Sequence, residues 1–149
     1  MKHFAVAGAC ALFLAVGAAS ADPYVDYTPQ KGLWDVTAIK VDPNHIDDYL
    51  KGLKAVWVPG EEIAKKHGVI DQYFVMVKAN ATGGDANVLL GQHYVSFAMM
   101  DPDKKRDVAM QKEGEAIMSK DAQATTVSGF DKYRSFVGED LWVPMEFTK

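Results

Sequence analysis

Two of the three Asp-Pro dipeptides in the chain stand between a strand-like segment and a segment with helical periodicity. Residues 42–43 follow the β-branched residues of 33–41, and residues 101–102 follow the apolar segment 88–99. Aspartate is favoured just before a helix, and proline suits the first helical turn because its missing N–H has no partner there. Each Asp-Pro therefore predicts the end of a strand and the start of a helix.

The other segments complete two strand–helix–strand units. Residues 69–79 predict the strand after the first helix, residues 127–137 suggest further helical turns after the second, and residues 141–147 predict a closing strand, which Pro144 confines to an edge or a bulge. This order predicts a ferredoxin-like, split βαβ fold of the α+β class. We expect a four-stranded antiparallel sheet, helices on one face, and an extra helical segment before the last strand.

Pro59 interrupts the first predicted helix, which begins after residues 42–43 and ends before Gly68. Proline has no N–H to donate to the carbonyl four residues earlier, and its ring clashes with that carbonyl. We therefore expect a kink or a split near Pro59. The acidic pairs Glu61-Glu62 and Glu139-Asp140 are both predicted to be solvated.

The first 21 residues have the layout of a secretory signal peptide. A short positive start is followed by an uncharged apolar run and by small residues at 19–21, which predicts cleavage after Ala21. No later segment approaches the ~20 apolar residues of a membrane-spanning helix. We expect an exported protein, periplasmic or secreted, with an irregular N-terminal arm at 22–32 and a single domain at 33–149.

Composition removes several classes of function. The net charge is −4, from 16 Lys and Arg against 20 Asp and Glu, which disfavours nucleic acid and anionic membranes as partners. The only cysteine, Cys10, lies in the predicted leader, so the mature protein has no thiol chemistry and no disulfide. No histidine pair has metal-ligand spacing, so we predict no metal site and no cofactor.

The two central strands are predicted to be apolar on both sides. In residues 69–77, alternation places one set of side chains on one side of the strand and the other set on the other side: Val69, Asp71, Tyr73, Val75 and Val77 against Ile70, Gln72, Phe74 and Met76. Residues 88–97 alternate similarly, and neither of their sides is polar throughout. Helices cover only one face of such a sheet, and a second copy of the chain is the simplest cover for the other. The sequence therefore predicts a homodimer.

This element order, with its paired Asp-Pro helix starts, resembles the dimeric α+β barrel superfamily, in which two ferredoxin-like sheets face each other. The superfamily includes antibiotic-biosynthesis-monooxygenase-like domains, stress-responsive barrel proteins and some haem-handling enzymes. The resemblance covers residues 33–147, and no catalytic signature of a member family matches. It implies a dimer and suggests two activities: a cofactor-independent monooxygenase-like enzyme, or a haem-binding protein with a single histidine ligand.

His93 is the candidate catalytic residue because it lies in the middle of a predicted strand, where it could point into a cavity and act as a base. A hydrogen-bonded structural histidine is the plainer interpretation. Four aromatic residues are candidates for lining an apolar ligand pocket, namely Trp57, Tyr73, Tyr94 and Phe97. The leading functional hypothesis is a homodimeric module that binds a small apolar ligand; whether it is an enzyme stays open.

Overall fold

The computed structural model describes residues 21–80 and 85–148. Apart from Ala21, the predicted signal peptide lies outside the described residues. The described elements follow one another in this order: β1 (Tyr27–Pro29), β2 (Leu33–Val41), η1 (Pro43–His45), α1 (Ile46–Lys66), β3 (Ile70–Val77), β4 (Val88–Tyr94), η2 (Phe97–Met100), α2 (Lys104–Ile117), α3 (Lys120–Phe130), β5 (Arg134–Trp142) and β6 (Met145–Phe147).

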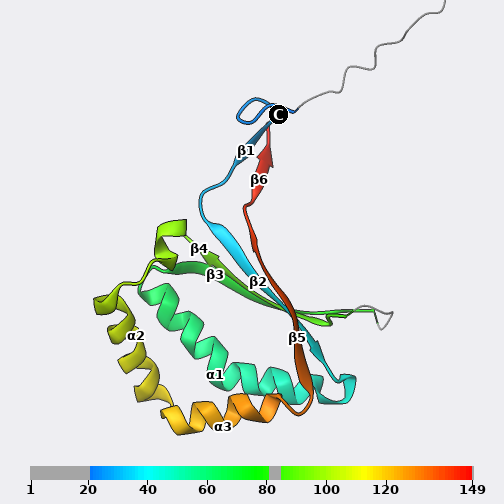
Figure 1. Ribbon diagram of the computed structural model, residues 1–149, viewed down its shortest axis with the longest axis vertical. Coiled ribbons are helices and arrows are strands. Elements are labelled where there is room, and N and C mark those ends of the chain that lie inside the picture. Colours follow the sequence, from blue (N-terminus) through cyan, green and yellow to red (C-terminus); the bar gives the residue numbers. More distant parts are fainter. Residues whose placement is uncertain (1–20, 81–84, 149) are drawn as a thin grey trace, which may run out of the picture.

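The main sheet confirms the predicted fold. Its four strands are all antiparallel to their neighbours and lie in the order β3-β4-β2-β5. This order is ferredoxin-like, with the first and third strands of the motif, β2 and β4, in the centre. Figure 1 shows α1, α2 and α3 on one side of this sheet. The extra helical segment predicted before the last strand is α3.

The core lies between the sheet and α1. Tyr49 and Leu53 on α1 pack against Ile39 and Val88, which are fully buried on the two central strands. Phe130, at the end of α3, lies 5.0 Å from the Tyr49 ring in a T-shaped arrangement. The apolar spacing in α1 therefore predicts correctly which face of the helix packs against the sheet.

The two predicted helix starts differ in detail. The Asp42 carboxylate accepts a hydrogen bond from the Asn44 N–H at 2.9 Å and begins η1, which leads directly into α1. The second helix is capped by Asp103, whose carboxylate accepts from the Arg106 N–H at 3.0 Å. The strand predicted at 88–99 is shorter than expected, because β4 ends at Tyr94 and the short helix η2 follows it. Asp101 and Pro102 therefore lie between η2 and α2 and do not directly follow a strand.

Pro59 does not split α1, which is one helix from Ile46 to Lys66. Figure 1 shows that α1 bends partway along its length. Of the two expected outcomes, the helix therefore shows the kink. Packing on the sheet from both halves holds the helix together across the missing hydrogen bond.

The prediction of helical turns through residue 137 is wrong at its C-terminal end. α3 ends at Phe130, and β5 begins at Arg134. Arg134 pairs with Val41 and Phe136 with Ile39, with a register shift between Ile39 and Ala38. Apolar residues spaced three apart fit a helix as well as an edge strand. Here the backbone N–H and C=O groups along one edge of β2 need partners, and a strand at this position supplies them.

The predicted strict alternation of the second strand is wrong at its start. The register shifts between Ile70 and Gln72: Ile70 pairs with Tyr94, whereas Gln72 pairs with His93. This bulge places Ile70, which is buried, on the helix side of the sheet. It also leaves Asp71 as the unpaired residue at the start of β3.

The N-terminal arm is more regular than predicted. β1 pairs with β6 in a separate two-stranded antiparallel sheet, with Thr28 opposite Glu146. Figure 1 shows this ribbon projecting away from the main sheet, beyond the ends of β2 and β5. Pro144 lies between β5 and β6, and its carbonyl accepts a hydrogen bond from the Gln30 N–H at 2.8 Å. No helix within the described residues is long and apolar enough to cross a membrane.

Candidate functional site

The helices leave one face of the main sheet uncovered, and we call it the open face. Residues directly opposite one another on antiparallel strands point to the same face, so the register defines it as three rows. From β3 across to β5, these rows are Gln72–His93–Trp34–Trp142, Phe74–Gly91–Val36–Asp140 and Met76–Leu89–Ala38–Gly138. Most of these side chains are apolar, and those of Met76 and Trp142 are more than half exposed.

His93 lies in the first row, where two neighbours fix its ring. Its Nδ1 is 2.7 Å from the Asp71 Oδ1, so Nδ1–H donates to that carboxylate. The ring centroid is 5.1 Å from that of Trp34. A Cβ atom at Gly32 would come within 2.8 Å of the ring, so glycine there permits the close approach of the chain. The bond with Asp71 leaves Nε2 as the ring nitrogen available for a proton or a ligand.

An open groove runs beside His93, where the β1–β6 ribbon leaves the main sheet. It has a volume of about 600 Å³ and is lined by Thr28, Pro29, Gln30, Lys31, Trp34, Gln72, His93 and Pro144. Apart from His93, Lys31 is the only residue with a charged side chain among the described residues that line the groove. The groove therefore combines a tryptophan ring with a small number of polar groups, which is the usual composition of a small-molecule site.

The four predicted aromatic ligand residues do not line this groove. Trp57 and Tyr73 meet edge to face at 5.5 Å, and the Tyr73 hydroxyl donates to Glu62 at 2.7 Å. Tyr94 packs with the small buried cluster around Ile70 on the helix side of the sheet. Phe97 belongs to η2 and is 57 % exposed. The aromatic neighbour of His93 is instead Trp34, and only the pairing of β2 with β4 brings these two together.

Two carboxylic acids are buried on the helix side of the sheet, contrary to the expectation that Glu61 is solvated. Asp35 on β2 and Glu61 on α1 are each 7 % exposed. The Asp35 Oδ1 and the Glu61 Oε2 have no hydrogen-bond partner among the described residues. Burial, with a further contribution from Asp35, raises the pKa of Glu61 to about 7, and burial with the nearby Glu139 raises the pKa of Asp35.

These acids do not form a metal centre with other residues. Among residues 21–80 and 85–148, no group of three or more His, Cys, Asp or Glu side chains could hold a metal ion. A third acid, Glu113, has partners of its own: its carboxylate accepts a hydrogen bond from Lys66 Nζ at 2.8 Å and contacts the His67 Nε2 at 3.0 Å. This contact joins α1 to α2, so His67 has a structural partner.

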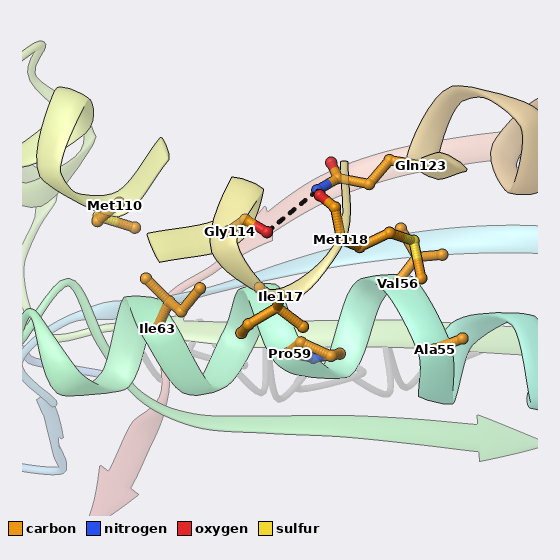
Figure 2. A pocket seen from close by; sticks show the side chains of 10 residues that line it. Ala55, Val56, Pro59, Ile63, Met110, Gly114, Ile117, Met118 and Gln123 are labelled. Atoms are coloured by element: carbon orange, nitrogen blue, oxygen red, sulfur yellow. Dashed lines mark hydrogen bonds between the residues drawn. The ribbon is translucent and has the colours of Figure 1, made fainter. Parts of the chain in front are cut away.

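A second, more apolar pocket lies between the helices (Figure 2). It has a volume of about 160 Å³. Its lining comes from Ala55, Val56, Pro59, Gly60 and Ile63 on α1, from Met110, Gly114 and Ile117 on α2, and from Met118 and Gln123. The Gln123 Nε2 donates to the Met118 carbonyl at 2.8 Å, which ties the start of α3 to the end of α2. Among the described residues, no charged side chain lines this pocket.

Comparisons with known proteins give structural neighbours without a family. No protein-family model matches the chain, and no curated protein matches it either. Three solved structures are similar in fold. HapK from Hahella chejuensis has a TM-score of 0.43 and 12% identity, over 73% of this chain and 89% of that one. A dimeric ferredoxin-like protein from an uncultured marine organism has a TM-score of 0.49 and 12% identity, over 80% and 94%. A NipSnap family protein of unknown function from Agrobacterium tumefaciens has a TM-score of 0.47 and 14% identity, over 83% of this chain and 97% of that one.

Proposed function

We propose that this protein is an exported homodimer whose two copies pack through their open faces and enclose a small, largely apolar ligand beside His93. The observation that carries the proposal is the composition of the open face. Its middle row joins Phe74, Gly91 and Val36, with one acidic residue, Asp140, only at the edge strand. Removing an apolar face of this kind from water lowers the free energy of the system, which favours association.

A second copy on this face would also roof the groove. Trp34 and His93 belong both to the open face and to the groove lining. The groove is open in a single copy, and a ligand in it gains contacts on its far side only when a partner covers it. Dimer formation and ligand binding are therefore expected to strengthen each other.

The dimer is tested by sedimentation velocity on purified protein at low and high salt. We expect a dimer at both, because an apolar interface on the order of 2,000 Å² is little affected by ionic screening. Val36→Lys places a charge in the middle row and should give monomers. Val108→Lys is the matched control, because Val108 is 40 % exposed on α2, away from the sheet.

The result that refutes this interface is a monomeric wild-type protein, or a Val36→Lys variant that stays dimeric. Circular dichroism melts of both variants show that the chain still folds. Export is tested separately by the intact mass of the protein from its native host, which should begin at Asp22. A species that retains the apolar leader contradicts export by cleavage.

A second candidate, a cofactor-independent monooxygenase-like enzyme, is favoured by the His93–Asp71 contact. A carboxylate that holds Nδ1–H orients the ring and stabilises the imidazolium that forms when Nε2 takes a proton. The test incubates the protein in air with a panel of phenols and quinols and analyses the products by mass spectrometry. The substrate is the only source of electrons, so the expected product has gained one oxygen atom and lost two hydrogen atoms, and the second oxygen atom of O2 leaves as water. Loss of this product in His93→Gln supports the enzyme; binding without turnover supports the binding module.

A further inference from the structure

The pocket between the helices owes its space to two glycines. Gly60 on α1 and Gly114 on α2 both line it, and Gly114 is labelled in Figure 2. A Cβ atom at Gly60 would meet nothing within 4 Å, and one at Gly114 would meet only the Ile63 Cδ1, at 4.0 Å. Glycine inside a helix lowers stability relative to alanine. Alanine would fit both positions, so tight packing does not explain either glycine.

One residue that lines the pocket has a backbone carbonyl without its usual helical donor. Ala55 and Pro59 both line it, and they stand four residues apart on α1. In an unbroken helix the N–H of residue 59 would donate to the carbonyl of Ala55, but proline has no N–H. The Ala55 carbonyl is therefore free of its usual helical partner. Besides the Gln123 amide, the residues that line this pocket therefore include one whose backbone carbonyl lacks the N–H that normally binds it.

We propose that this pocket binds a small aromatic molecule that carries one hydrogen-bond donor, of the phenol class, with the donor bound by the Ala55 carbonyl. The volume of about 160 Å³ fits one benzene-sized ring, since apolar protein cavities of ~150 Å³ hold benzene. Met110 and Met118 are flexible, polarizable side chains that adapt to a ring and contact it favourably. This site is separate from the groove at His93 and does not depend on dimer formation.

Phenol and toluene are the probes, because they have nearly the same shape and differ in one donor. Calorimetric titration of the purified protein should give Kd values on the order of 0.1–1 mM for such small ligands. A hydroxyl buried without a partner would weaken phenol about tenfold or more relative to toluene. With the Ala55 carbonyl as acceptor, we expect the two affinities to agree within about threefold.

Three variants make the test specific. Gly60→Leu fills the pocket and should abolish the binding of both probes, whereas Gly129→Leu is the matched control, because a Cβ atom at Gly129, on α3, also meets nothing within 4 Å. Pro59→Ala restores the N–H to the Ala55 carbonyl. It should weaken phenol by about fivefold or more relative to toluene, whose binding it should preserve.

Several results overturn the proposal. If neither probe binds the wild-type protein saturably, the pocket is only a packing defect. If Gly60→Leu binds both probes as the wild type does, the ring lies elsewhere. If Pro59→Ala changes phenol and toluene equally, the Ala55 carbonyl is not the acceptor. A wild-type monomer in sedimentation leaves these results unaffected, so the two proposals fail separately.

Discussion

Replacing the buried Glu61 by glutamine should stabilise the protein above pH 7 and have a much smaller effect near pH 5. The pKa of Glu61 rises from 4.5 in the unfolded chain to about 7 in the folded protein, mainly through burial and further through the charge of Asp35. Between these values the folded state binds more protons than the unfolded state. The free energy of unfolding therefore falls as the pH rises through this window.

The magnitude follows from the size of the pKa difference. A gap of about 2.5 pKa units at ~1.4 kcal/mol per unit makes the ionised Glu61 cost about 3 kcal/mol of stability at pH 8. The side chain is 7 % exposed, so solvent screening removes little of this cost. At pH 5 the folded state keeps Glu61 protonated, and the remaining cost is below ~1 kcal/mol. Glutamine never ionises and avoids the cost at both pH values.

Urea unfolding of wild type and Glu61→Gln at pH 5 and pH 8 measures this difference. Taking the variant against wild type at each pH cancels every contribution that the two proteins share. Glu62→Gln is the matched control: Glu62 is exposed, and a glutamine there can still accept from the Tyr73 hydroxyl, which donates to Glu62 at 2.7 Å. An equal effect of Glu61→Gln at the two pH values would refute the reasoning, since it would mean that Glu61 is ionised in the folded protein throughout.

Two further predictions concern the sheet, and both are measured by urea unfolding. Gly91→Ala should lower stability by about 1–3 kcal/mol, because a Cβ atom there would lie 2.1 Å from the Phe74 ring. Gly138→Ala is the control and should be close to neutral, because a Cβ atom at Gly138 would meet nothing within 4 Å. Equal effects of the two substitutions would show that Phe74 moves aside freely. Asn87→Ala should cost about 1–3 kcal/mol, because its amide exchanges two hydrogen bonds with the Val41 backbone, at 2.8 and 2.7 Å. The exposed Asn44→Ala is the control, and an equally small loss in both would contradict a clamp between β2 and β4.

Much of the fold was predictable because its signals are local. The first predicted strand, residues 33–41, coincides with β2, and the apolar spacing of α1 identifies the face that packs on the sheet. The proline inside α1 also predicts that this helix bends, as Figure 1 shows. The errors fall where a distant partner decides. Residues 134–137 carry a helical pattern but belong to β5, which pairs with β2. The arm at 22–32 gains a strand only because β6 lies beside it.

The candidate sites were less predictable for the same reason. His93 was identified from its place in a strand, but its partner Asp71 reaches it only through a bulge, and Trp34 only through the pairing of β2 with β4. The burial of Glu61 depends on which turn of α1 lies over Asp35. Neither effect leaves a signal in the nearby sequence.

By itself, the sequence determined the order of strands and helices, the helix faces and the class of fold, because these depend on periodicity and on the residues at the ends of each element. The tertiary structure alone decided which polar groups lack partners, which glycines leave open space, and which aromatic ring lies beside His93. These properties depend on contacts between residues far apart in the chain. Such contacts are fixed by strand register and helix packing, where a shift of one residue changes every neighbour.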